Sequence, residues 1–225
     1  MSTSVEIPDL PHLDARSFAG LVGASRPALV VIDIQKDFVA EDGFCGLAGA
    51  DLTTMPAAID RIERMIDAAR SAAIPVVFVR LFTTPESDSP AMLRLMERRG
   101  RAGGAGLCRT DTPGAEYHRV RPAAGDVEVI KRRYDAFLET DLDARLRARG
   151  IDTLLVTGVS TDCCVDSTAR AAFQRDYDVF IVSDACAAAS PALHLGALAA
   201  LERNVAMLVD TDTAAAALAM RVEAA

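Results

Sequence analysis

Six apolar runs of strand length, most of them followed by a segment with helical periodicity, constrain the fold of this chain more than any other feature. The runs cover residues 28–35, 75–81, 127–132, 153–159, 178–185 and 205–210, and the helical patterns cover 55–73, 139–149, 162–175, 191–203 and 213–223. Because the runs are continuously apolar, we expect both faces of their sheet to be buried. Right-handed crossovers then place helices on both faces. The pattern predicts a Rossmann-like, three-layer α/β/α fold around a mostly parallel six-stranded sheet.

No Gly/Ser-rich or Pro-rich linker divides the 225 residues, so the sequence predicts one domain over 1–225. We expect an N-terminal arm over about 1–27 and an insertion over about 83–126, which has little periodicity outside about 91–99. An irregular segment of that length is usually a lid, a binding loop or a subunit contact. It concentrates basic side chains, namely Arg94, Arg98, Arg99, Arg101 and Arg109. These form either a solvated helix end and loop or a basic rim for an anionic substrate or a neighbouring subunit.

Charge and composition argue against several classes of function. The chain carries 24 Lys and Arg residues against 32 Asp and Glu residues, a net charge of −8. This excess of negative charge argues against the basic surface that binding to nucleic acid requires. No apolar run approaches the roughly 18 residues that a membrane span needs, and the N-terminus lacks the basic and apolar halves of a signal peptide. We therefore expect a cytoplasmic protein with no nucleic-acid or membrane partner. Its five cysteines include no C-x-x-C pair, which argues against a zinc site.

Polar side chains stand at or just beyond the ends of three predicted strands. In open parallel sheets, ligands bind beyond the carboxyl ends of the strands, near the point where the strand order reverses. Asp33 is near the end of the first run, Lys131 is near the end of the third, and the pair Cys163 and Cys164 follows the fourth. A carboxylate and an ammonium in apolar strands are costly to bury unless they are paired. Asp33 and Lys131 could form a purely structural ion pair, or they could meet a thiol in one crevice.

The neighbouring thiols indicate which chemistry such a crevice would perform. A helix beginning near Asp162 would place Cys164 in its first turn, where unpaired N–H groups and the helix dipole favour an anion. That position and a nearby lysine are expected to lower the cysteine pKa from about 8.5 toward neutrality. The same N–H groups could receive the oxyanion of a tetrahedral intermediate. The sequence thus favours a cysteine nucleophile over the strained alternative, a vicinal disulfide between Cys163 and Cys164.

Three motifs carry a resemblance to a known family: "VVIDIQKDF", "KRRYDAFLETDL" and "GIDTLLVTGVSTDCCVDSTARAAFQRDYDVFIVSDA". Over about residues 28–210 the chain resembles the isochorismatase-like cysteine hydrolase superfamily. That group includes nicotinamidases, N-carbamoylsarcosine amidases, ureidoacrylate and biuret amidohydrolases, and isochorismatases. The resemblance implies an amidohydrolase that cleaves an amide, ureido or carbamoyl C–N bond of a small molecule through a thioester intermediate.

The same resemblance assigns roles to individual residues. It implies that Cys164 is the nucleophile and that Cys163 is a bystander. Asp33 would be the general base and acid, and Lys131 would stabilise the thiolate. It also implies a cis peptide before Ser160, with the backbone N–H groups of Ser160 and Cys164 forming the oxyanion hole.

The sequence departs from the nicotinamidase pattern after its second strand. Nicotinamidases usually carry an Asp-x-His pair there that holds a metal, whereas this chain reads "RLFTTPESDSP", with no histidine. We therefore expect no metal, no other cofactor and a substrate other than nicotinamide. Phe38, Tyr134 and Phe137 flank the motifs, and they either wall the substrate pocket or pack in the core. Gln35 and Asp37 are expected to organise the loop after the first strand.

Two other functions stay open. An isochorismatase-type vinyl-ether hydrolase would use Asp33 and Lys131 without the cysteine, and a non-catalytic binding protein would keep only the fold. The presence of Asp33, Lys131 and Cys164 together argues against the binding protein. We also expect a homo-oligomer, a dimer or tetramer, because members of that superfamily commonly assemble. The alanine-rich last helix, over 213–223, either contacts a partner or packs on its own sheet.

Overall fold

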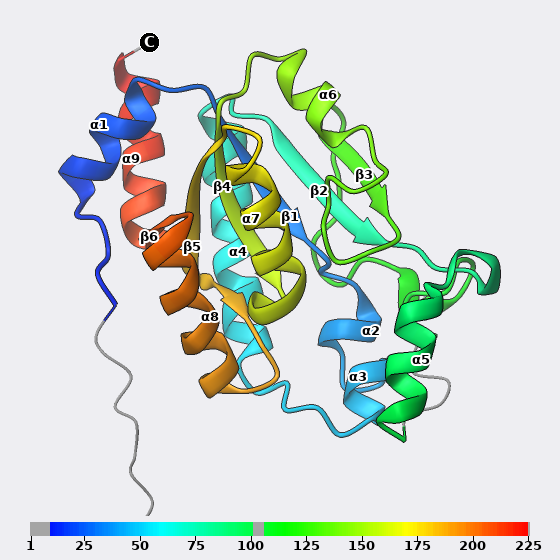
Figure 1. Cartoon of the computed structure of the whole chain (residues 1–225). Helices are drawn as coiled ribbons and strands as arrows, with labels where there is room; N and C mark the ends of the chain where they lie inside the picture. Colours follow the sequence, from blue (N-terminus) through cyan, green and yellow to red (C-terminus); the bar gives the residue numbers. More distant parts are fainter. Residues whose placement is uncertain (1–9, 101–105, 225) are drawn as a thin grey trace, which may run out of the picture.

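One parallel sheet forms the centre of the molecule (Figure 1). The computed structural model describes residues 10–100 and 106–224. In this part of the chain the sheet has six strands in the order β3-β2-β1-β4-β5-β6, and every pair is parallel. The strands are β1 (Pro27–Ile32), β2 (Val76–Leu81), β3 (Val127–Lys131), β4 (Thr153–Val159), β5 (Asp178–Ala187) and β6 (Met207–Val209). The three-layer α/β/α prediction is confirmed.

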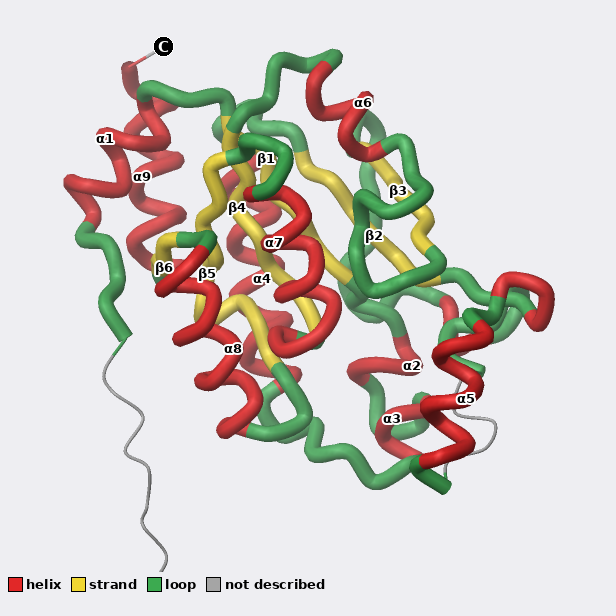
Figure 2. Tube along the Cα trace, in the orientation of Figure 1, coloured by secondary structure: helices red, strands yellow, loops and turns green. Residues whose placement is uncertain are grey.

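Helices cover both faces of the sheet (Figure 2). Residues of α1, α4 and α9 share one hydrophobic cluster with the sheet, and residues of α6, α7 and α8 share a second cluster on the other face. The helices are α1 (Ala15–Gly23), α2 (Lys36–Val39), α3 (Phe44–Leu47), α4 (Met55–Ser71), α5 (Pro90–Arg98), α6 (Leu142–Arg147), α7 (Asp166–Phe173), α8 (Pro191–Asn204) and α9 (Thr211–Ala224). None of the helices in the described residues has the length and apolarity that crossing a membrane would require.

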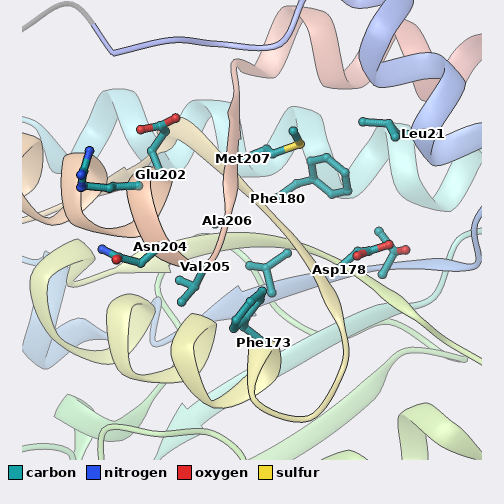
Figure 3. Close-up of a pocket in the computed structure, with 12 residues that line it drawn as sticks. Leu21, Phe173, Asp178, Phe180, Glu202, Asn204, Val205, Ala206 and Met207 are labelled. Atoms are coloured by element: carbon teal, nitrogen blue, oxygen red, sulfur yellow. The ribbon is translucent and has the colours of Figure 1, made fainter.

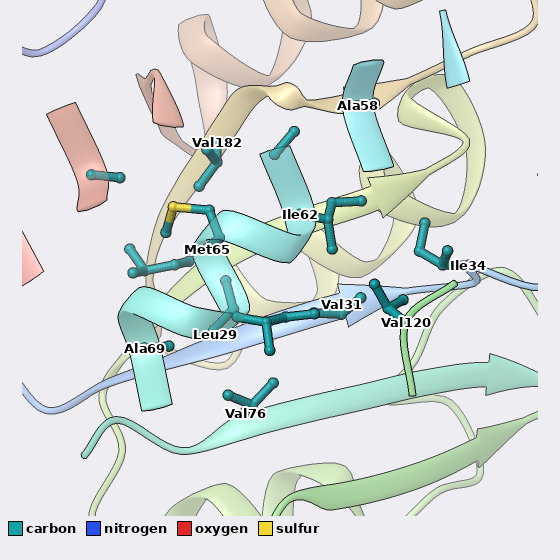
Figure 4. Close-up of a cluster of buried hydrophobic side chains, with 14 of the residues drawn as sticks. Leu29, Val31, Ile34, Ala58, Ile62, Met65, Ala69, Val76, Val120 and Val182 are labelled. Carbon is teal, nitrogen blue, oxygen red and sulfur yellow. The ribbon is translucent and has the colours of Figure 1, made fainter. Parts of the chain in front are cut away.

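The contact between α4 and β1 shows how helical periodicity builds the core (Figure 4). Ile62, Met65 and Ala69 recur at intervals of three or four residues, so they share one face of α4. That face packs in one cluster with Leu29 and Val31 of β1, and all five side chains are at most 1% exposed. Full burial of one large aliphatic side chain is worth about 1.5–3 kcal/mol. These helix–strand contacts fix β1, which leads directly to Asp33.

The strand order reverses between β1 and β4. Ile32, at the end of β1, is paired with Gly158 near the end of β4. Gly158 has a φ of 120°, and a Cβ atom at this position would lie 2.2 Å from the carbonyl oxygen of Ile32. Because glycine has no Cβ and tolerates positive φ, it permits this close approach. The chain segments that follow β1 and β4 therefore leave the sheet side by side, at the point where ligands bind in such folds.

The two ends of the described chain pack against each other. α1 lies within the predicted N-terminal arm, and Asp14 caps it by accepting the backbone N–H groups of Arg16 and Ser17. Phe18 and Val22 of this helix are fully buried. α1 packs against α9, and α9 also packs against α4. The alanine-rich last helix therefore packs within its own chain.

The predicted insertion over 83–126 contains α5 and two short 3-10 helices, Pro85–Ser87 and Pro113–Ala115. No residue of α5 is fully buried. Residues 101–105, which include Arg101, lie outside the described part of the chain. The insertion leaves the sheet at the carboxyl end of β2 and returns to the amino end of β3, and α5 lies beyond the carboxyl end of β2 (Figure 1).

Candidate functional site

A carboxylate, an ammonium and a thiol meet beyond the carboxyl ends of β1, β3 and β4. Asp33 directly follows β1, Lys131 is the last residue of β3, and Cys164 follows β4. The Lys131 Nζ lies 2.7 Å from the Asp33 Oδ2 and 3.3 Å from the Cys164 Sγ, and it donates to the Arg133 carbonyl oxygen at 3.0 Å. Asp33 and Lys131 are 0% exposed and Cys164 is 4% exposed. The structure thus brings together the three residues singled out from the sequence.

Burial controls the acidity of the Asp33–Lys131 pair. Burial raises the pKa of Asp33 above its ordinary value, and the Lys131 charge and the Cys164 thiol oppose that rise only in part. Burial by itself lowers the pKa of Lys131, but the charges of Asp33 and Cys164 outweigh burial, so this pKa lies above its ordinary value. Neither carboxylate oxygen of Asp33 has a well-aligned hydrogen-bond donor among the described residues, although the ammonium lies against Oδ2. Asp33 is thus a buried base that retains acceptor capacity.

The two neighbouring cysteines are free thiols that interact with each other. Their hydrogen bond, followed by burial, raises the pKa of Cys164 well above its ordinary value, and the Lys131 charge opposes both effects. The same hydrogen bond lowers the pKa of Cys163. The expectation of a lowered Cys164 pKa is therefore wrong, because it neglected burial and the adjacent thiol. The Cys164 thiol keeps its proton at rest, so a base must remove that proton before attack.

An irregular turn carries Cys164. Residues Thr161–Val165 form a π-helical turn, and α7 begins only at Asp166, so the regular helix expected from Asp162 starts four residues later. The Val159–Ser160 peptide bond at the start of this turn is cis. Ser160 precedes this turn and Cys164 lies within it, so both backbone N–H groups lie close along the chain to the thiol.

Gln35 and Asp37 organise the loop after β1, as predicted. The Gln35 amide accepts the Leu81 N–H at 2.7 Å and donates to the Leu81 and Ala115 carbonyl oxygens at 2.9 Å. The Asp37 carboxylate accepts the N–H groups of Phe44 at 3.0 Å and Cys108 at 2.7 Å. Both side chains are therefore occupied in joining β1 to β2 and to the insertion.

The three aromatic residues near the motifs have different environments. Tyr134 is 42% exposed, and its hydroxyl lies 3.3 Å from the Met92 Sδ on α5. Burial raises the pKa of Tyr134 to about 12, and the charges of the Cys163 and Cys164 thiols add to the rise. Phe38 is half-buried and packs against the core. Phe137 is 5% exposed, lies in the same hydrophobic cluster as Cys164, and has its ring centroid 5.8 Å from that of Tyr177.

The arginines of the insertion do not form one rim. The Arg109 guanidinium donates to both carboxylate oxygens of Asp88, at 2.7 and 2.6 Å, so it is committed to an internal ion pair. Arg94, Arg98 and Arg99 lie exposed on α5 and at its C-terminal end. Arg99 is close enough to Tyr134 to lower its pKa slightly against the effect of burial.

A surface groove lies elsewhere on the molecule (Figure 3). Its lining includes Thr153 and Asp178, which begin β4 and β5, together with Leu21, Phe173 and Met207. Because it lies at the amino ends of these strands, it is separate from the Asp33–Lys131–Cys164 cluster. Within the described ranges, no group of three or more His, Cys, Asp or Glu side chains is placed to hold a metal ion.

Known proteins share both the sequence pattern and the fold. The family model described as the isochorismatase domain matches residues 27–213. A ureidoacrylate amidohydrolase RutB from Methylorubrum extorquens is 35% identical over 207 residues, covering 87% of this chain and 84% of that protein. A cysteine hydrolase from Pseudomonas syringae pv. phaseolicola has a TM-score of 0.75 at 26% identity, covering 87% of this chain and 93% of that one. N-carbamoylsarcosine amidase from Thermoplasma acidophilum has a TM-score of 0.67 at 30% identity, with coverages of 83% and 97%.

Replacing Lys131 by methionine tests the electrostatics of the site. This change leaves the Asp33 carboxylate buried without a counter-charge, so the free energy of unfolding should fall by about 3–5 kcal/mol at about pH 8. The stability that Asp33 contributes is fullest below its unfolded-state pKa of 3.8 and is lost as the pH rises through its raised folded-state pKa. Without the ammonium this folded-state pKa rises further, so the deficit against wild type should shrink toward about pH 5.

Urea unfolding at both pH values measures this deficit. Lys36→Met is the matched control, because it breaks an exposed ion pair with Glu116 (2.6 Å) and should change stability little at either pH. A Lys131→Met deficit that does not depend on pH would contradict the buried-carboxylate account.

Proposed function

Because this chain belongs to the isochorismatase family, we propose that it is a cysteine-dependent amidohydrolase that uses Cys164 as nucleophile, Asp33 as proton carrier and Lys131 as electrostatic support. One observation carries the proposal: a single buried ammonium contacts both the carboxylate, at 2.7 Å, and the thiol, at 3.3 Å. Burying a carboxylate, an ammonium and a thiol together costs free energy of desolvation, which argues against a purely structural role for the three groups. An enzyme that must move a proton between sulfur and a carboxylate requires this arrangement.

The chain is a hydrolase of carbon–nitrogen bonds other than peptide bonds, the class to which its amidohydrolase and amidase relatives belong. Two relatives named as ureidoacrylate amidohydrolase RutB, from Methylorubrum extorquens and Yersinia enterocolitica, match 87% and 80% of this chain and 84% and 83% of their own length. The family match over 27–213 also supports the proposal of one domain over the whole chain.

The first half of the proposed reaction forms a thioester. Asp33 accepts the Cys164 thiol proton as the sulfur attacks the substrate carbonyl carbon. Burial raises the pKa of Asp33 and so makes its carboxylate a stronger base, which works against the raised pKa of the Cys164 thiol. The Lys131 ammonium stabilises the negative charge on sulfur as it develops, and the backbone N–H groups of Ser160 and Cys164 receive the oxyanion.

The second half of the reaction returns the site to its resting state. Asp33 gives its proton to the leaving nitrogen, and the C–N bond breaks to leave the acyl group on the Cys164 sulfur. A water molecule deprotonated by the same carboxylate then attacks the thioester carbonyl carbon. The sulfur leaves and is reprotonated, and the products are ammonia or an amine together with an acid or a carbamate.

We propose that the substrate is a small amide or ureido compound that carries an anionic group. The Tyr134 hydroxyl contacts the Met92 sulfur and so joins the chain after β3 to α5, and the charges of the two cysteine thiols act on Tyr134. Arg99 at the end of α5 supplies a positive charge next to Tyr134. A carboxylate on the substrate would fit between these groups, with Phe38 as a further apolar neighbour of the loop after β1. The ureidoacrylate amidohydrolases named above suggest the same class of substrate.

Two other functions would use only some of Asp33, Lys131 and Cys164, or none of them. An isochorismatase-type vinyl-ether hydrolase would protonate its substrate through Asp33 and Lys131, and it would leave Cys164 unused. A non-catalytic binding protein would have no reason to keep the ammonium in contact with both other groups. The contact between Lys131 and the Cys164 sulfur therefore favours the amidohydrolase.

We further propose that the chain forms a homo-oligomer through α5. This helix exposes Leu93 and Leu95 (44% and 38%) beside Arg94 and Arg98, whereas the whole chain has a net charge of −8. An apolar, basic helix on an acidic protein is complementary to a second acidic copy. Light scattering after size-exclusion chromatography should give a mass above that of one chain, and a Leu93→Glu variant should lower it. A wild-type monomer mass would remove this proposal.

Turnover of a substrate panel tests the proposed function. Release of ammonia or an amine is measured with primary amides and ureido acids for wild type, Cys164→Ala and Cys163→Ala. We expect Cys164→Ala to lower the rate by about 10³-fold or more, because no other group can form the thioester. Cys163→Ala, the matched control on the adjacent thiol, should keep most of the activity. Equal amine release by wild type and Cys164→Ala would contradict the cysteine nucleophile, and hydrolysis of a vinyl ether that survives Cys164→Ala would favour the vinyl-ether mechanism.

A further inference from the structure

The turn that carries the two cysteines is irregular. It spans Thr161–Val165 as a π-helical turn, in which the N–H groups of Cys163 and Val165 both donate to the Ser160 carbonyl oxygen, at 3.0 and 3.2 Å. Turns of this type are rare and are found mostly at functional sites. The Ser160 hydroxyl donates to the Asp162 carboxylate, but this bond lies within the turn and does not tie it to the sheet. The position of the Cys164 side chain relative to the sheet therefore also depends on contacts that other elements make with the turn.

Two side-chain hydrogen bonds join Thr161–Val165 to other elements in the described part of the chain. One is the contact between Lys131 and the Cys164 sulfur. The other joins the Thr161 hydroxyl to the His194 Nδ1 at 2.8 Å. Thr161 is 0% exposed, so its hydroxyl has no access to solvent. The proposed reaction makes no use of His194, and this bond is unexplained by it.

His194 is well placed to act as a rigid support. It lies in the first turn of α8, where its backbone N–H donates to the Ser190 carbonyl oxygen at 3.0 Å and the Ser190 hydroxyl accepts the Leu193 N–H at 3.2 Å. α8 packs directly against the turn. Burial lowers the pKa of His194, with the Asp162 charge opposing it, so the imidazole is neutral near pH 7. A neutral ring on a capped helix holds the hydroxyl without adding a charge beside the thiols.

We propose that His194 is a positioning residue, whose hydrogen bond to Thr161 fixes the π-helical turn so that the Cys164 sulfur stays in contact with the Lys131 ammonium. The inference rests on the proposed role of Cys164. Without this bond the buried Thr161 hydroxyl would lack a hydrogen-bond partner, and the turn would shift until the hydroxyl found another acceptor or donor. The sulfur would then move away from the ammonium, which is the group that opposes the effects of burial on the thiol.

The pH dependence of alkylation at Cys164 tests this inference. Iodoacetamide labelling is followed by peptide mass spectrometry in a Cys163→Ala background, where one thiol of the pair titrates. In that background the charged groups facing Cys164 are Asp33 and Lys131, and the one facing His194 is Asp162. Loss of the lysine contact should raise the apparent thiol pKa by about 1 in either His194→Ala or Thr161→Val, a tenfold smaller thiolate fraction at neutral pH.

Two further variants separate positioning from general stability. Combining His194→Ala with Thr161→Val should raise the apparent pKa no more than either change alone, because both remove one bond. His194→Asn keeps a polar group near the Nδ1 position and should restore most of the wild-type pH profile.

The inference fails if Thr161→Val, which keeps the shape of threonine, leaves the pH profile unchanged while lowering only the melting temperature. Additive shifts in the combined variant would also overturn it. The labelling needs no substrate, so it can be read even if the wild-type protein turns over no amide or ureido compound. That result would count against the proposed function and would leave the test of His194 intact.

Discussion

The Lys131 ammonium is buried between a carboxylate and a thiol, and removing such a charge from water costs several kcal/mol that only its neighbours can offset. Those neighbours come from distant parts of the sequence. Asp33 follows β1, Cys164 follows β4, and the Arg133 carbonyl oxygen lies just after β3. The ends of three strands must therefore be fixed relative to one another, and the rest of the fold can be understood as the means of fixing them.

The reversal of strand order next to β1 provides this arrangement. Gly158 lets β4 approach β1 so closely that a Cβ atom would meet the Ile32 carbonyl oxygen. Asp33 then leaves the strand with a φ of 56°, a left-handed conformation that an aspartate tolerates better than most residues. Such conformations cost about 1–3 kcal/mol and persist where surrounding structure imposes them. Gln35 holds the next turn against β2, so the carboxylate cannot relax away from the ammonium.

Much of this site could be predicted from the sequence because its residues occupy strand ends, which are visible as breaks in apolar runs. The positions of Asp33, Lys131 and Cys164 follow from that rule. The acidity of Cys164 could not be predicted, since it depends on burial and on the hydrogen bond with the adjacent Cys163 thiol. In the sequence, Phe137 is an apolar aromatic residue next to a motif whether it lines a pocket or packs in the core, so its environment could not be predicted. Nor does any spacing link Thr161 to His194, which lies on the next-but-one helix and meets it only through tertiary packing.

The nucleophile is tested most directly by acid quenching during turnover of a reactive amide or ureido acid, followed by mass spectrometry of the peptide that carries both cysteines. A thioester survives acid, so the account predicts the mass of the acyl group on Cys164 in wild type and none in Cys164→Ala. An acyl group on Cys163, or rapid turnover with no adduct on either sulfur, would contradict it.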